Sequence, residues 1–374
     1  MSTIGNIEKS QEITGNSTSD KHKSSLFFAS IKAQSVLFFI TAAYVIATFF
    51  LSRNTPGIQP YEFNVTFFLV MLPILFLSVI ILRFFHICNH VKPEHPIQAL
   101  YHDLKGFLSC PRRLSLGVPV IIALFFFIEA FAFIKTNIPA FRPFGWDVYF
   151  MELDRWMHFG IHPWEYLQPV FGYAPVTFLI NVSYNTWFMV MWTVFIWQAF
   201  ADHPSRLRLQ FFISFLLVWS IGGSLLAVVF SSAGPAFYAA LNLTPNPYEE
   251  LMTYLYQVNE ALPIWALNIQ ELLWASYTDK QGVVSGISAM PSMHNASAIL
   301  FALLGWQVSR IHGIALTLFA IMIFLGSIHL GWHYAVDGYL AAIIAISAWW
   351  IAGKIAAWID DQPAAKAYKA LFDG

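Results

Sequence analysis

Apolar residues follow one another in long runs through most of the chain, and short polar segments separate these runs. A helix of roughly 20 apolar residues is long enough to cross a bilayer core of about 30 Å. Eight runs of about this length are predicted to span a membrane: 33–51, 63–85, 116–134, 175–200, 209–230, 293–309, 313–330 and 334–353. The pattern therefore predicts an all-α, polytopic helical membrane bundle, in which two early helices pack against a six-helix core.

The same pattern divides the chain into four parts. Residues 1–25 are rich in Ser, Thr, Lys and Asn, and predict a disordered cytoplasmic tail. Residues 26–115 would hold the two N-terminal transmembrane helices and a cytoplasmic loop. The membrane core would occupy residues 116–357, and a cytoplasmic C-terminal tail residues 358–374.

Composition agrees with a membrane location. Of the 374 residues, 57% are hydrophobic, 17% are aromatic and only 11% are charged, whereas an average soluble domain carries about 25% charged residues. A soluble globule is therefore excluded. The formal net charge of -1 provides no basic field for nucleic acid. A membrane lipid is the expected partner, and no obligate protein partner is indicated.

The placement of cations predicts the orientation. With eight spans, 15 of the 20 Lys and Arg residues fall on the side of the N-terminus, and cytoplasmic loops retain positive charge. Both termini are therefore expected in the cytoplasm, as in a protein of the bacterial inner membrane, although a Golgi protein would orient similarly. The opposite, periplasmic side holds the five remaining cations: Arg53, Lys135, Arg142, Arg155 and Lys280.

Two long loops, 135–174 and 231–292, lie on this outer side, and long loops are often functional. Within the second loop, residues 248–275 predict an amphipathic helix at the membrane interface. The two cysteines, Cys88 and Cys110, fall on the cytoplasmic side, where a disulfide is not expected.

Three titratable residues at the outer helix ends form the candidate catalytic group. His294 opens the sixth predicted span, after a Pro and a Ser that favour a helix start. His333 precedes Asp337 by four residues, so on a helix the imidazole and the carboxylate share one face and can hydrogen-bond. Such a bond fixes the tautomer and leaves the other ring nitrogen free as a nucleophile or general base, and a second histidine could protonate a leaving group.

These residues also carry a resemblance to a known family. Residues 291–294 (Pro-Ser-Met-His) and 333–337 (His-Tyr-Ala-Val-Asp) resemble the second and third signature motifs of the type 2 phosphatidic acid phosphatase superfamily. Their surroundings look most like the inositol phosphorylceramide synthase branch, an inositolphosphotransferase group. The resemblance implies that His333 attacks phosphorus to form a phosphohistidine, that Asp337 orients His333, and that His294 acts as acid and then base.

The chain departs from this pattern at two phosphate-binding positions. The family usually has an Arg six residues before the nucleophilic histidine, where this chain has Ser327, and the region of the first motif, 232–238, contains no cation. Lys135 with Arg142 and Pro143 reproduces the spacing of the first motif, but two spans too early in the chain. The candidate substrate-binding residues are Ser292, Tyr238, Lys135, Arg142 and Ser327.

Because the outer side holds few cations, it favours a substrate with little negative charge. A phosphate monoester is nearly dianionic at neutral pH, whereas a phosphodiester carries one charge. The sequence therefore predicts a lipid phosphatase or phosphotransferase acting on a lipid phosphodiester or lipid-linked phosphate, with no cofactor and no metal. Two alternatives remain open. Histidines and Asp337 could relay protons in a transporter or channel, or His329, His333, Asp337 and His294 could hold zinc in a metal-dependent hydrolase.

Overall fold

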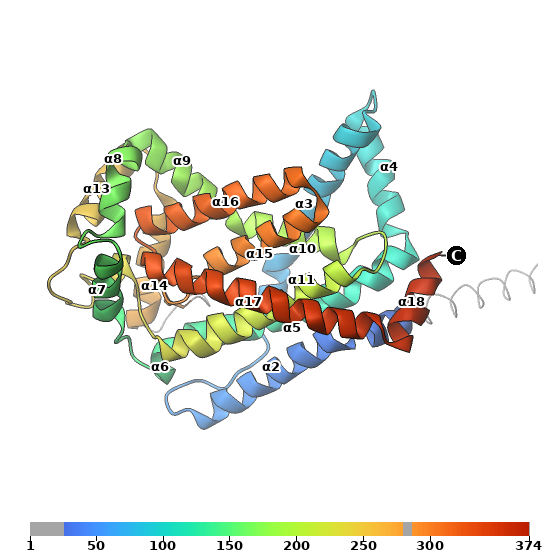
Figure 1. Ribbon diagram of the computed structural model, residues 1–374, viewed down its shortest axis with the longest axis horizontal. Helices are drawn as coiled ribbons and strands as arrows, with labels where there is room; N and C mark the ends of the chain where they lie inside the picture. Colours follow the sequence, from blue (N-terminus) through green and yellow to red (C-terminus); the bar gives the residue numbers. More distant parts are fainter. Residues whose placement is uncertain (1–25, 280–285, 374) are drawn as a thin grey trace, which may run out of the picture.

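The computed structural model describes residues 26–279 and 286–373, which consist of helices and loops without a strand. The predicted tail, residues 1–25, lies outside the described residues, as does Lys280. The long helices run alongside one another as a bundle (Figure 1), so the all-α polytopic architecture is confirmed.

Seven helical segments are long and apolar enough to cross a membrane. Three of them are composite: α3 continues into a π-helical segment, η1, α9 and α10 join at Thr186, and a second π-helical segment, η2 (Val218–Leu226), connects α11 to α12 (Ala227–Val229). The seven segments are α2 (Ser35–Asn54), α3 (Val65–His86) with η1 (Ile87–Val91), α5 (Pro111–Thr136), α9 (Ala174–Asn185) with α10 (Trp187–Ala199), α11 (Arg206–Leu217) with η2 and α12, α16 (Arg310–His329) and α17 (Ala335–Asp360).

The remaining predicted span corresponds to a shorter helix, α15 (Met293–Val308), of 16 residues. At 1.5 Å per residue it is about 24 Å long, less than a bilayer core. It is shorter because it begins inside the bundle, where Ser292 and Met293 are buried. Its other end turns into α16 through a single residue, Ser309.

The core surrounds α5 and α15. In the most apolar window of α5, 72% of the residues are buried, compared with 22% in α2 and in α3. The two early helices are therefore peripheral: α2 packs on α5, and α3 packs on α10. The helices α5, α9–α10, α11, α15, α16 and α17 form the six-helix core.

Short helices gather at one end of the bundle, on the left in Figure 1. They are α6 (Ile138–Phe141), α7 (Asp147–Met157), α8 (Pro163–Phe171), η3 (Pro235–Phe237), α13 (Glu249–Ala261) and α14 (Trp265–Asp279). The sequence predicted one helix over residues 248–275, whereas the structure has two. Pro263 has no N–H to continue the helix, and the side chain of Asn259 accepts the N–H of Ile264 instead.

The opposite end of the bundle holds α4 (Pro96–Leu108) and α18 (Pro363–Asp373) (Figure 1). Tyr368 and Phe372 of α18 pack in one buried cluster with Leu26 and Leu116. The first and last described segments therefore meet at this end. Both cysteines, Cys88 and Cys110, are free thiols.

Candidate active site

Two histidines from different hairpins face each other near the end of the bundle that carries the short helices. His294 lies in the first turn of α15, and His333 lies in the loop between α16 and α17. Their ring centroids are 6.5 Å apart. The structure therefore brings together the two imidazoles that the sequence singled out.

Asp337 holds one nitrogen of His333. The Nδ1 atom of His333 lies 3.1 Å from Oδ2 of Asp337, and the same oxygen accepts the N–H of Tyr334 at 3.0 Å. Asp337 is completely buried and stands in the first turn of α17. This arrangement leaves Nε2 of His333 as the ring nitrogen directed away from the carboxylate.

His294 lies between two aromatic rings. Its ring is 4.9 Å from that of Tyr184 and 4.1 Å from that of Trp187, measured between centroids. Both aromatic residues flank the junction of α9 and α10 at Thr186. Neither residue was predicted to be part of the site, although the polar residues 185–186 inside an apolar run were a signal of a break in the helix.

Backbone and side-chain hydrogen bonds tie the two histidine segments together. The N–H of Ser292 donates to the main-chain carbonyl of Asp337, at 3.3 Å. The carbonyl of Ser327 accepts the N–H groups of Trp332 and His333, at 2.9 and 3.0 Å. Asn295 donates from its side chain to Oγ of Ser327, at 3.3 Å.

Ser292 and Ser327 are buried and use their hydroxyls locally. Oγ of Ser292 accepts the N–H of Asn295 as the N-cap of α15. Oγ of Ser327 donates to the carbonyl of Phe324. Both serines therefore position the histidine segments, and neither lines the cavity between the two histidines and the end of α5.

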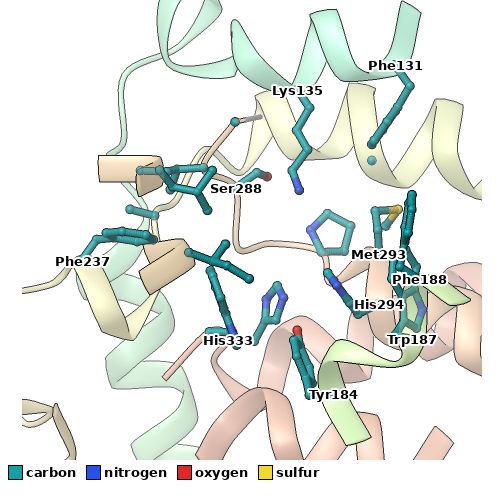
Figure 2. Close-up of a pocket in the computed structure, with 18 of the residues that line it drawn as sticks. Phe131, Lys135, Tyr184, Trp187, Phe188, Phe237, Ser288, Met293, His294 and His333 are labelled. Carbon is teal, nitrogen blue, oxygen red and sulfur yellow. The ribbon is translucent and has the colours of Figure 1, made fainter. Parts of the chain in front are cut away.

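A cavity of about 260 Å³ opens between the two histidines and the end of α5 (Figure 2). Its walls are largely aromatic and apolar, and they come from α5, α9, α10, η2, α14 and the segment before α15. Among the residues that line it are Phe131, Lys135, Tyr184, Trp187, Ala233, Ser288, His294 and His333. Gly223 also lines it, and a larger residue would not fit there, because a Cβ at this position would lie 2.6 Å from the ring of Phe131.

Lys135 is the one cation among the described residues that line this cavity. It extends from the last turn of α5, and Figure 2 shows its amino group directed towards the space beside the histidines. None of the described acidic side chains forms an ion pair with it. A buried or half-buried cation with no counter-ion is costly, so this side chain is suited to an anionic ligand.

Two other predicted binding residues lie elsewhere. Arg142 is exposed, and its guanidinium carbon is 5.9 Å from the ring centroid of Trp146. Tyr238 is completely buried and packs against the ring of Tyr248, 5.4 Å away. The structure does not bring either residue to the cavity.

Burial controls the charge of His333. Desolvation lowers the pKa of His333 to about 3, the positive charge of Lys135 acts in the same direction, and a backbone interaction with Ala289 opposes them. The imidazole is therefore neutral at pH 7, which is the form that can act as a nucleophile.

No group of three His, Cys, Asp or Glu side chains converges to hold a metal ion in the described part of the chain. His329, which the zinc alternative required, is completely buried and points elsewhere. Its Nε2 atom lies 2.9 Å from the hydroxyl of Thr177, and its ring packs against Phe171 and Tyr254.

The fold and the site together define a class: a helical membrane protein in which a buried His–Asp pair faces a second histidine across a cavity with one cation. A family model of the PAP2 superfamily matches residues 148–351, more than half of the chain. The protein therefore belongs to the PAP2 superfamily, whose members are generally phosphatases or phosphotransferases. No match was found among curated proteins or among solved structures.

The matched region includes His294, His333 and Asp337 but begins after Lys135 and Arg142. The family assignment therefore supports a membrane enzyme of the phosphatase or phosphotransferase type. The cation of the cavity comes from a helix outside the matched region.

Proposed function

We propose that this protein transfers or hydrolyses the phosphate group of a membrane lipid through a phosphohistidine intermediate on His333. The observation that carries the proposal is the pairing of Nδ1 of His333 with Asp337, 3.1 Å apart, opposite His294 at 6.5 Å between ring centroids. A neutral imidazole held in one orientation presents its other nitrogen to an electrophile.

The proposed reaction has two steps. In the first, Nε2 of His333 attacks phosphorus, a P–N bond forms, the P–O bond to the leaving alcohol breaks, and His294, whose protonated form the negative charge of the bound phosphate would favour, gives its proton to the departing oxygen. In the second, neutral His294 takes a proton from an acceptor alcohol or water, which attacks phosphorus and releases His333. Each histidine thus returns to its starting state.

The substrate follows from the charge of the cavity. Lys135 would contact a non-bridging phosphate oxygen, and the aromatic walls would surround the uncharged parts of the ligand. One cation matches the single charge of a phosphodiester better than the nearly two charges of a monoester. A lipid phosphodiester or a lipid-linked phosphate is therefore the proposed substrate, as expected for an inositolphosphotransferase-like branch.

The proposed location is the inner membrane of a bacterium, with the site facing the periplasm. The distribution of Lys and Arg supports cytoplasmic termini. The first and last described segments meet at the end of the bundle opposite the short helices that surround the site (Figure 1).

The test of this mechanism is the His333→Ala variant, compared with His329→Asn in the same helical hairpin. Removing a nucleophile costs about 10³-fold or more in rate, so His333→Ala should lose turnover of a phosphatidyl-headgroup lipid. His329→Asn alters a buried histidine outside the cavity and should retain turnover within about tenfold. Activity would be measured in detergent and lipid mixtures by mass-spectrometric identification of products.

Two outcomes would count against the proposal. Unchanged turnover in His333→Ala would remove the nucleophile. Activity of the unsubstituted protein on phosphatidic acid alone, with none on a phosphatidyl-headgroup lipid, would contradict the proposed preference for a phosphodiester.

A further inference from the structure

Two buried carboxylates stand on α7, outside the catalytic trio. Asp147 opens the helix and Asp154 lies seven residues later, about two turns along, so both share one face. Each is only 2% exposed. The helix lies against α17 at the end where that helix begins (Figure 1).

Asp154 binds the first turn of α17. Its two oxygens accept the N–H groups of Ala335 and Val336, at 2.7 and 2.9 Å. The first N–H groups of a helix have no partner within the helix, and negative charge at that end is favourable. Asp154 therefore caps, from another helix, the turn that begins two residues after His333.

Asp147 binds Tyr334, the residue after His333, and also the segment before η3. Its carboxylate accepts the N–H of Ala233 at 3.0 Å and the N–H of Gly234 at 2.8 Å. It also accepts the hydroxyl of Tyr334, at 2.8 Å. A Cβ on Gly234 would lie 2.6 Å from the carbonyl oxygen of Trp332, so this segment is pressed against the residue before His333.

Neither carboxylate has a cationic partner among the described residues. Burial raises the pKa of both groups, that of Asp154 to about 7, and the backbone donors oppose the shift. A carboxylate can accept two adjacent N–H groups with two oxygens, whereas an amide would present an NH₂ group to one of them. This chemistry explains why a costly buried acid stands at each position.

We propose that Asp147 and Asp154 are positioning residues, which act together as a clamp that fixes the His333 loop in its reactive orientation. The clamp binds residues directly after His333 through Asp154, and through Asp147 it binds Tyr334 and the segment that contacts Trp332. A displacement of 1 Å at a reacting group can cost about 10²-fold in rate. Lys135 stands on a different helix, so loss of the clamp leaves the phosphate contact in place.

The effect on rate rests on the proposed function, and it is tested with Asp154→Asn. This change keeps the volume of the side chain, but it replaces one acceptor oxygen with an NH₂ group. That donor would then face a backbone N–H, which is also a donor. We expect kcat to fall by about 10- to 100-fold, with KM within about threefold. Glu152→Gln is the matched control, because it neutralises an exposed carboxylate on the same helix and should change neither quantity.

A second variant and a second measurement keep the inference separate from the catalytic proposal. Tyr334→Phe removes only the hydroxyl that donates to Asp147 and should lower kcat by a smaller factor; it decides the question if Asp154→Asn does not fold. Carbethoxylation of His333 by diethyl pyrocarbonate, followed by mass spectrometry, should be at least about threefold faster in Asp154→Asn than in Glu152→Gln, because the loop is less restrained.

The outcomes distinguish the two ideas. If His333→Ala loses activity but Asp154→Asn and Tyr334→Phe keep the kcat of the control, the clamp is wrong and the nucleophile stands. If KM alone rises, the carboxylates act on binding and the clamp is also wrong. If His333→Ala stays active, the proposed function fails, and the carbethoxylation rates alone decide whether the clamp restrains the loop.

Discussion

The two ends of the bundle each contain a cation inside the protein, and their surroundings differ. Arg208 stands in the first turn of α11, at the end where the first and last described segments meet, and is 2% exposed. Its guanidinium donates to main-chain carbonyls and one amide oxygen, those of Leu116, Gln198, Ala199 and Gln34. Lys135, at the other end, has no ion-pair partner among the described residues and faces the cavity.

The difference separates a structural role from a binding role. Buried polar groups are almost always hydrogen-bonded, and Arg208 meets that rule with groups from three other segments of the chain. It therefore joins α5, α10 and α11 to the residues before α2. Lys135 has its amino group directed at the cavity and no ion-pair partner among the described residues, which supports the proposal that its partner is a bound phosphate group.

The largest expected effect is on stability, from Arg208→Met. The change leaves several buried carbonyls without donors, and each unsatisfied group costs about 1–3 kcal/mol, so the total loss should be about 3 kcal/mol or more. The thermal unfolding midpoint in detergent should fall by several degrees, while turnover per folded molecule stays the same. An unchanged midpoint would show that the guanidinium network is dispensable.

Lys135→Met is the matched change at the other end, and it should affect activity. Loss of one charged donor to a transferring phosphate costs about 10²-fold or more in kcat/KM. The unfolding midpoint should stay or rise, because an unpaired charge is removed from the interior. Lys135→Arg, which keeps the charge, should recover part of the rate. A loss below about threefold in Lys135→Met would break the contrast with Arg208.

The smallest effect is expected from Arg142→Met. Together with Lys135, this residue reproduces the spacing of the first family motif in the sequence. In the structure, however, it is exposed beside Trp146, outside the cavity. Steady-state kinetics should therefore show kcat/KM within about twofold of the unsubstituted protein, since exposed charges contribute little. A loss as large as that of Lys135→Met would mean that the guanidinium reaches the substrate, and that the outer loops rearrange when it binds.

Local sequence signals predicted most of the fold. Apolar run length gave the long helices, because it depends only on the distance that a helix must cover. It did not predict that α15 begins inside the bundle, or that Pro263 divides the outer amphipathic segment into α13 and α14. Nor did it predict that Glu129 of α5 accepts the hydroxyl of Tyr61 from the loop before α3.

The candidate site was predicted where its parts are close in sequence. His333 and Asp337 are four residues apart, and their expected pairing is present, although His333 lies just before α17 and not on it. The aromatic neighbours of His294 are more than 100 residues from it, and Asp147 and Asp154 are more than 180 residues from Tyr334 and Ala335. Such contacts depend on how helices pack, and a single sequence carries no local signal for them.

The short length of α15 has a consequence for the proposed reaction. α15 has four residues fewer than α16, which corresponds to about 6 Å of helix, and its N-cap, Ser292, is buried. Under the proposed function, a phosphate that reaches His294 would enter a cavity with largely apolar walls and would lose much of its hydration shell. A water-soluble ester would lose this hydration without a compensating gain, whereas a lipid keeps its chains in the bilayer throughout. The buried start of α15 therefore favours a lipid over a water-soluble ester.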